Sequence, residues 1–269
     1  MNCKKTLSLS DFKIKIYTRS MNKTLYDRAI SFVDLPYEKV KLQGTTADGY
    51  IVQLINDEEA DIIINIDEDA FVCDIDKLKE LLIYCIENEY VNCGMPDGGV
   101  IHLRKWNPVV TNPYFNILNV KELRKKIAEF KEEDFAESKE SQMKDFPVEL
   151  LKTNYEFVSY EPYYPLLIWM SQNFKTLYLN AHTHLDGIST VLHDQNDKPF
   201  IIHSWYSRYY NENWYHTQRI NNVIDECGKL RNKPYPISFS DKCVSYIKIF
   251  IKICKKIVVR GIRRIGLIK

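Results

Sequence analysis

The sequence lacks the motifs of several protein classes. Its seven cysteines include no C-x-x-C pair, and neither a P-loop nor a G-x-G-x-x-G segment is present. The odd number of cysteines is typical of a reducing cytoplasm, not of a disulfide scaffold or zinc module. Without either glycine-rich phosphate motif, ATPase and dehydrogenase functions lack support. No apolar run is long enough to span a bilayer, and polar residues follow Met1 where a signal peptide would be apolar. We therefore expect a cytoplasmic protein.

Charge is balanced over the 269 residues but concentrated at the C-terminal end. Residues 241–269 contain nine Lys or Arg against one acid, whereas the whole chain has a net charge of +1. From Ser245 onward, apolar residues follow helical spacing with basic residues between them. This pattern predicts that residues 236–269 form a basic amphipathic tail, peripheral on the inner, anionic face of the cell membrane. A helix docked on the protein itself and a nucleic-acid tail are the alternatives, and the wide apolar arc disfavours nucleic acid.

The first hundred residues alternate between strand-like and helix-like segments. We predict strands at 12–17, 37–42, 61–66 and 90–95, and helices at 22–32, 46–56 and 75–88. The strand at 61–66 is apolar on both faces, which is typical of a parallel sheet covered by helices. The order of elements predicts an α/β fold whose first half is a Rossmann-like nucleotide-binding unit.

After Gly94 the regular alternation ends. We expect an amphipathic helix at 120–130, a charged and solvated insertion at 131–145, and a buried helix at 165–174. Further strands would complete a mixed central sheet within one domain, residues 1–235. The basic tail would follow this domain.

The third predicted strand runs directly into three acids, Asp67-Glu68-Asp69. Carboxylates are not crowded at the end of a core strand unless water or a cation compensates their repulsion. Residues two apart on an extended segment point the same way, so Asp67 and Asp69 can share one hard cation, Mg²⁺ or Mn²⁺, that also binds phosphate oxygens. A solvated turn is the alternative. Because open α/β sheets bind ligands beyond the carboxyl ends of strands, we favour the cation site.

With this D-x-D segment in its place, the chain resembles the GT-A glycosyltransferases from residue 12 to residue 95. The resemblance implies that Asp67 and Asp69 hold a cation bridging the donor's diphosphate, with Glu68 at the variable middle position of the nucleotide-sugar site. It places Thr18 and Arg19 at the nucleotide. The segment "GMPDGG" resembles the turn at the donor sugar, so Asp97 would bind sugar hydroxyls, although an Asp-Gly turn is an equal alternative.

A second group of candidate residues lies between 182 and 210, where four of the six histidines occur. The resemblance implies that a late His completes the cation's ligands, and His203, after the apolar strand 199–202, fits this role best. Its alternative is a packed histidine beside Trp205. Arg208 can pair with a phosphate, and Asp186 is the candidate catalytic base if the enzyme inverts. The segment from His182 to Asp186 matches the opening of a metallo-β-lactamase H-x-H-x-D-H site, but Gly187 replaces its last His.

The predicted function is a glycosyltransferase, hexosyltransferase-like, of the bacterial cell-surface polysaccharide type. It would use Mn²⁺ or Mg²⁺ and a nucleotide diphosphate sugar, for which we expect a UDP-sugar, with a glycan or lipid-linked molecule as acceptor. Two alternatives stay open. One is a non-catalytic nucleotide-sugar-binding protein, and the other is a D-x-D phosphatase, although Phe71 stands where that class has Thr or Val.

Overall fold

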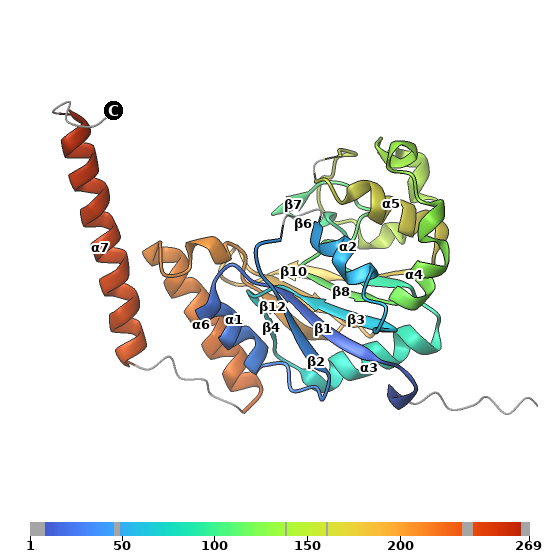
Figure 1. The fold of residues 1–269 in the computed structure, drawn as a ribbon, viewed down its shortest axis with the longest axis horizontal. Helices are drawn as coiled ribbons and strands as arrows, with labels where there is room; N and C mark the ends of the chain where they lie inside the picture. Colours follow the sequence, from blue (N-terminus) through green and yellow to red (C-terminus); the bar gives the residue numbers. More distant parts are fainter. Residues whose placement is uncertain (1–8, 46–48, 138, 160, 233–238, 265–269) are drawn as a thin grey trace, which may run out of the picture.

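The computed structural model describes residues 9–45, 49–137, 139–159, 161–232 and 239–264. Two larger sheets, a two-stranded sheet and the helices around them form the body, and a long C-terminal helix stands beside it (Figure 1). The predicted α/β class, the mixed central sheet and the C-terminal helix are confirmed.

The first sheet is mixed, with strand order β2-β1-β3-β8-β5-β9. Its strands are β1 (Ile14–Arg19), β2 (Glu38–Leu42), β3 (Ile62–Ile66), β5 (Asn92–Gly94), β8 (Phe115–Leu118) and β9 (Thr176–Tyr178). Strands β1, β2 and β3 are parallel, as the alternating sequence predicts. Strand β8 lies antiparallel between β3 and β5, so the fourth predicted strand does not pair with the third. The chain leaves β5, makes a hairpin of β6 (Gly98–Ile101) and β7 (Arg104–Lys105), and returns in the opposite direction.

The helices are α1 (Lys23–Ser31), α2 (Gly49–Ile55), α3 (Ile75–Glu87), α4 (Val120–Lys126), α5 (Tyr164–Asn173), α6 (Trp214–Leu230) and α7 (Phe239–Arg264). All helices except α6, which was not predicted, lie close to their predicted positions. Short 3-10 turns are Leu9–Asp11, Ile127–Glu129, Glu132–Phe135, Glu140–Met143, Val148–Leu150 and Ser207–Tyr209. Side chains of Asn22 and Asp74 accept hydrogen bonds from free backbone N–H groups at the starts of α1 and α3, which explains where these helices begin. The predicted insertion at 131–145 is mostly exposed.

Strand β3 is apolar on both faces because each face meets its own core. Ile62, Ile64 and Ile66 pack in one cluster with α1 and α3. Ile63 points the other way, into a second cluster with residues of α2, α4 and α5. Alternate residues of a strand point to opposite faces, so every isoleucine of β3 is removed from water.

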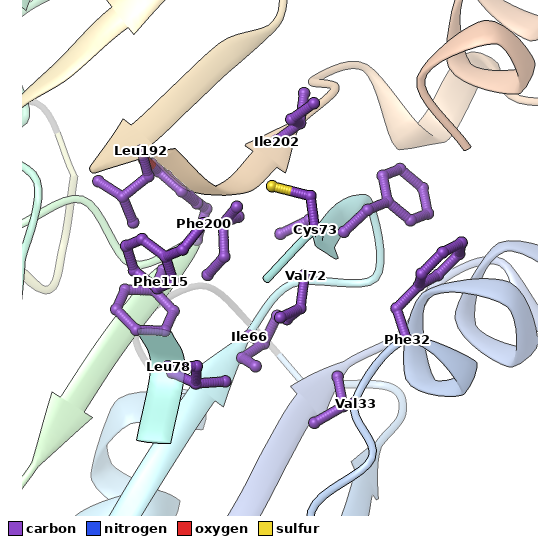
Figure 2. Close-up of a cluster of buried hydrophobic side chains, with 14 of the residues drawn as sticks. Phe32, Val33, Ile66, Val72, Cys73, Leu78, Phe115, Leu192, Phe200 and Ile202 are labelled. Carbon is purple, nitrogen blue, oxygen red and sulfur yellow. The ribbon is translucent and has the colours of Figure 1, made fainter. Parts of the chain in front are cut away.

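A second, antiparallel sheet has the order β10-β11-β12-β4. Its strands are β4 (Ala70–Val72), β10 (Ala181–Thr183), β11 (Thr190–His193) and β12 (Pro199–His203). Only Asp67-Glu68-Asp69 separate β3 from β4, so this acidic turn carries the chain from one sheet to the other. Figure 2 shows the buried side chains that join the two sheets, among them Ile66 of β3, Val72 of β4 and Phe200 of β12.

Helix α7 stands beside α6 (Figure 1), and its side chains contact the body near the start of α6. The Trp214 and Tyr246 rings stack with centroids 3.7 Å apart, and Lys252 is paired with Glu212. Ile249 is buried. None of the helices in the described ranges combines the length and the apolar character needed to cross a membrane.

Candidate metal and diphosphate site

The pairing of β4 with β12 brings the predicted late histidine to the acidic turn. In this antiparallel pair His203 lies opposite Ala70, the residue directly after Asp69. The Nε2 atom of His203 is 3.1 Å from Oδ1 of Asp69. The backbone reinforces this position, because the Ser204 N–H donates to the carbonyl of Asp69. Two segments 134 residues apart in sequence therefore meet at one point.

Asp67, Asp69 and His203 form a group that can hold a metal ion. Each offers one ligand atom, and these atoms lie within 4.8 Å of one another. Oδ1 of Asp67 and Nδ1 of His203 are buried, and neither has a hydrogen-bond partner within the described part of the chain. Buried polar atoms are normally paired, so these two atoms are available for a ligand. Two carboxylates and an imidazole suit Mn²⁺ better than Mg²⁺, which prefers oxygen ligands alone.

The surroundings of this group hold it rigidly and disfavour its negative charge. The ring of Tyr114 stacks on His203 with centroids 4.2 Å apart, and Trp205 packs on the same imidazole. Burial raises the pKa of Asp67 to about 6. The positive charge of Arg19 lowers this pKa only in part, and the negative charge of Asp69 raises it further. A bound cation would relieve this repulsion.

The group opens into a cavity of about 300 Å³, within the size range of small-ligand sites. Three guanidinium groups line it together with the metal-binding group, and they come from β1 (Arg19), β7 (Arg104) and the turn after β12 (Arg208). Guanidinium groups bind phosphate oxygens through paired N–H donors. The cavity therefore combines a candidate cation site with three phosphate-binding side chains.

Asp97 does not reach this cavity, but it positions a residue that does. Its side chain is fully buried and accepts two hydrogen bonds from Arg104, at 2.6 Å each, with further bonds from Asn112 and Tyr164. With these partners its carboxylate is fully engaged, which argues against direct binding of sugar hydroxyls. The neighbouring Gly98 serves the hairpin, since a Cβ there would lie 1.7 Å from the carbonyl oxygen of Trp106.

Thr18 and Glu68 also lie outside the cavity lining. Thr18 is buried within β1, not in a loop, and pairs in register with Lys41 of β2. The Glu68 carboxylate accepts hydrogen bonds from the backbone N–H groups of Met21 and Asn22, at 3.0 and 2.8 Å. It therefore holds the β1–α1 loop, next to Arg19. Of the residues predicted at the nucleotide sugar, Arg19, Asp67 and Arg208 line the cavity. Thr18 and Glu68 lie behind it and support it.

Asp186, the predicted catalytic base, lies in the turn between β10 and β11 and does not line the cavity. Burial alone would raise its pKa, but hydrogen bonds from Ser189, from the backbone of Ile188 and from Arg219 lower it to about 2. A carboxylate with this pKa and these partners is a poor proton acceptor. The geometry argues against a role as base and instead makes Asp186 the anchor of Arg219, at 3.2 Å.

Sequence reasoning missed Arg104 and Glu161, which both line the cavity. Burial raises the pKa of Glu161. Its carboxylate forms no hydrogen bond or ion pair with any residue in the described ranges. The position of Glu161, just before α5, carried no recognisable motif. Arg104 could have been suspected only from the closeness of a basic residue to Asp97.

A larger hollow, of about 510 Å³, lies where α5 meets β9. Its lining contains one acid, Asp145, and one cation, Lys175. It offers neither a group of metal ligands nor several phosphate-binding cations, so the smaller cavity is the better candidate site.

Comparison with known proteins leaves the family of this chain open. No family model and no curated protein matches it. Among solved structures, a protein from STIV is 15% identical and covers 70% of this chain and 93% of its own, with a TM-score of 0.37. A mannosyltransferase from Pyrobaculum calidifontis, in complex with GDP-Man and Mn²⁺, is 8% identical and covers 63% and 55%, with a TM-score of 0.38. A glycosyltransferase involved in glycosylation of the major capsid of PBCV-1 is 11% identical and covers 53% and 70%, with a TM-score of 0.28. Structural similarity at these sequence identities and TM-scores does not assign the chain to a family.

The fold and the site by themselves define a coarser class. The chain is a mixed α/β protein that places an Asp-Asp-His group in an arginine-lined cavity at the carboxyl end of a buried strand.

Proposed function

We propose that this protein is a metal-dependent glycosyltransferase of the GT-A type, which moves a sugar from a nucleotide diphosphate sugar to a glycan or lipid-linked acceptor. The observation that carries the proposal is the Asp67–Asp69–His203 group, which faces the same cavity as three arginines. A divalent cation with surrounding guanidinium groups is a general arrangement for stabilising a departing diphosphate.

In this proposal each side chain of the cavity has a distinct task. The two aspartates and His203 would hold Mn²⁺ or Mg²⁺, which supplies Lewis-acid stabilisation of the leaving diphosphate when bound. Arg19, on β1, would bind phosphate oxygens or the nucleotide. Arg104 is oriented by its two hydrogen bonds to Asp97 and would bind donor oxygens.

Glu161 is the better candidate for a catalytic base if the reaction inverts the sugar. It lines the cavity, whereas Asp186 does not. Its raised pKa moves it toward neutrality, where a carboxylate accepts protons more effectively. The cavity contains two other carboxylates, Asp67 and Asp69, and the cation would occupy both.

Helix α7 supports a peripheral membrane contact through its free apolar stripe. Ile249 is buried and Lys252 pairs with the body, which sets the docked side of the helix. At 100° per residue, a different side carries the exposed residues Ile247, Phe250, Ile251, Ile257 and Val258. Exposed lysines, including Lys248 and Lys255, flank this stripe. We propose that α7 lies on the anionic inner leaflet of the cell membrane, next to lipid-linked acceptors of a surface polysaccharide.

A screen of nucleotide sugars, UDP-sugars and GDP-sugars first, tests the function. We expect slow donor hydrolysis that requires Mn²⁺ and is lost in Asp69→Asn. Asp76→Asn is the matched control, because it removes an exposed carboxylate on α3, outside the cavity. A non-catalytic binding protein would bind a nucleotide diphosphate with Mn²⁺ but turn over no donor. Release of phosphate from phosphate monoesters, without donor turnover, would favour the phosphatase.

A further inference from the structure

Exposed aromatic side chains gather at one place on the body. In the described part of the chain, every exposed Tyr or Trp lies between residues 206 and 215: Tyr206, Tyr209, Trp214 and Tyr215. These side chains are 39 to 56% exposed. Soluble proteins rarely cluster large exposed aromatic groups without a binding partner. We therefore expect this cluster to bind a ligand.

Three tyrosines and a histidine form a continuous surface, which we name the aromatic ledge: Tyr206, Tyr209, Tyr215 and His216. The His216 ring is the centre, with ring centroids 4.8 Å from Tyr206 and 5.3 Å from both Tyr209 and Tyr215. Tyr209 and His216 are almost parallel, with an angle of 18° between their planes. Because the rings support one another, their outer faces are presented in a fixed arrangement.

The ledge is built on a strained and well-anchored loop. Trp205 and Tyr206 both have left-handed backbone conformations, with φ of 57° and 63°. Such angles are unfavourable for bulky residues and persist only where the surroundings enforce them. Buried Arg219 does so, since it donates to the Trp205 carbonyl at 3.0 Å and lies 3.5 Å from Nδ1 of His216. Asp186 and Ser189 hold Arg219 in turn.

The ledge connects the cavity with α7. Tyr206 belongs both to the ledge and to the cavity lining. At the other end, Trp214, next to Tyr215, stacks on Tyr246 of α7. A molecule that reaches the cavity from the side of the proposed membrane contact would therefore pass over these rings.

We propose that the aromatic ledge binds sugar rings of the acceptor. This rests on the proposed function, because it assumes that an acceptor must reach the donor in the cavity. The C–H face of a pyranose is apolar and packs flat on an aromatic ring, while phenol and imidazole groups bond to its hydroxyls. Burial and the nearby Arg219 charge lower the pKa of His216, so its ring is neutral at pH 7 and presents no charge to a neutral sugar. Asp186 acts as a positioning residue through Arg219.

The test uses the full chain and defined probes: the methyl glycosides of glucose, galactose, mannose and N-acetylglucosamine. Saturation-transfer NMR measures their binding with either UDP or GDP and with Mg²⁺, which, unlike Mn²⁺, is diamagnetic and does not broaden the proton signals. We expect half-saturation concentrations to rise about fivefold in Tyr209→Ala and Tyr215→Ala, the size of one lost aromatic contact. Tyr209→Phe keeps the ring and loses only the hydroxyl, so its affinity should lie between those of the wild type and Tyr209→Ala. Leu185→Ala is the matched control, because it removes a fully exposed apolar side chain outside the ledge.

Three results would overturn the ledge proposal: no glycoside binds the wild type, the alanine variants bind as well as the wild type, or they lose affinity for UDP or GDP instead. Loss of binding to anionic vesicles with glycoside binding intact would make the ledge a membrane contact. A failure of the proposed function would give a different result from a failure of the ledge proposal. Without Mn²⁺-dependent nucleotide binding, a Tyr209-dependent glycoside signal would identify a sugar-binding surface on a protein of another function.

Discussion

Replacing Asp67 by Asn is expected to stabilise the metal-free protein at pH 7.5 and to remove its stabilisation by Mn²⁺. The folded state raises the pKa of Asp67 from the usual 3.8 to about 6. A rise of about two units corresponds to about 3 kcal/mol at pH 7.5. The direction in which stability changes with pH follows from proton binding. Between these two pKa values the folded protein keeps the proton that the unfolded chain has lost, so stability falls as pH rises through this window and stays low above pH 6.

The substitution removes this penalty, and its effect should depend on pH. We expect a gain of up to about 3 kcal/mol at pH 7.5 and about half of that at pH 5. Urea unfolding in EDTA at both pH values measures it. With Mn²⁺ at 100 times its dissociation constant, the wild type should gain about 2.7 kcal/mol and Asp67→Asn almost nothing. Asp76→Asn should behave like the wild type in all conditions. A loss of stability for Asp67→Asn in EDTA at pH 7.5, or an undiminished response to Mn²⁺, would refute the reasoning.

Three further substitutions or truncations test other parts of the structure. His203→Ala should weaken Mn²⁺-dependent binding of UDP or GDP, measured by calorimetry, at least tenfold more than His182→Ala does. The ring of His182 lies outside the cavity. Equal effects of the two substitutions would mean that His203 only packs in the core. Asp97→Asn should cost about 3 kcal/mol in urea unfolding, because it leaves the guanidinium of Arg104 unpaired in a mostly buried site, and a change below 1 kcal/mol would contradict this. Removal of residues 239–269 should abolish flotation with anionic liposomes while donor hydrolysis persists; an unfolded product would show instead that α7 is part of the core.

The first half of the fold was readable from the sequence because its signals are local. Strands β1, β2 and β3 and helices α1 and α3 have clear periodicity and bounded ends, and all were predicted within a few residues. Strand β8 breaks the expected order. Its insertion between β3 and β5 depends on where the chain returns after the β6–β7 hairpin, and no local pattern encodes that.

The same distinction holds for the candidate site. Adjacent acids after an apolar strand made Asp67 and Asp69 recognisable by residue type and spacing alone. Their meeting with His203 was expected only from a family resemblance, and the pairing of β4 with β12 accounts for it physically. The tasks of Asp97 and Asp186 were out of reach of sequence reasoning. Whether a carboxylate faces a cavity or a buried guanidinium depends on partners distant in the chain, and only tertiary packing brings Arg104 and Arg219 to them.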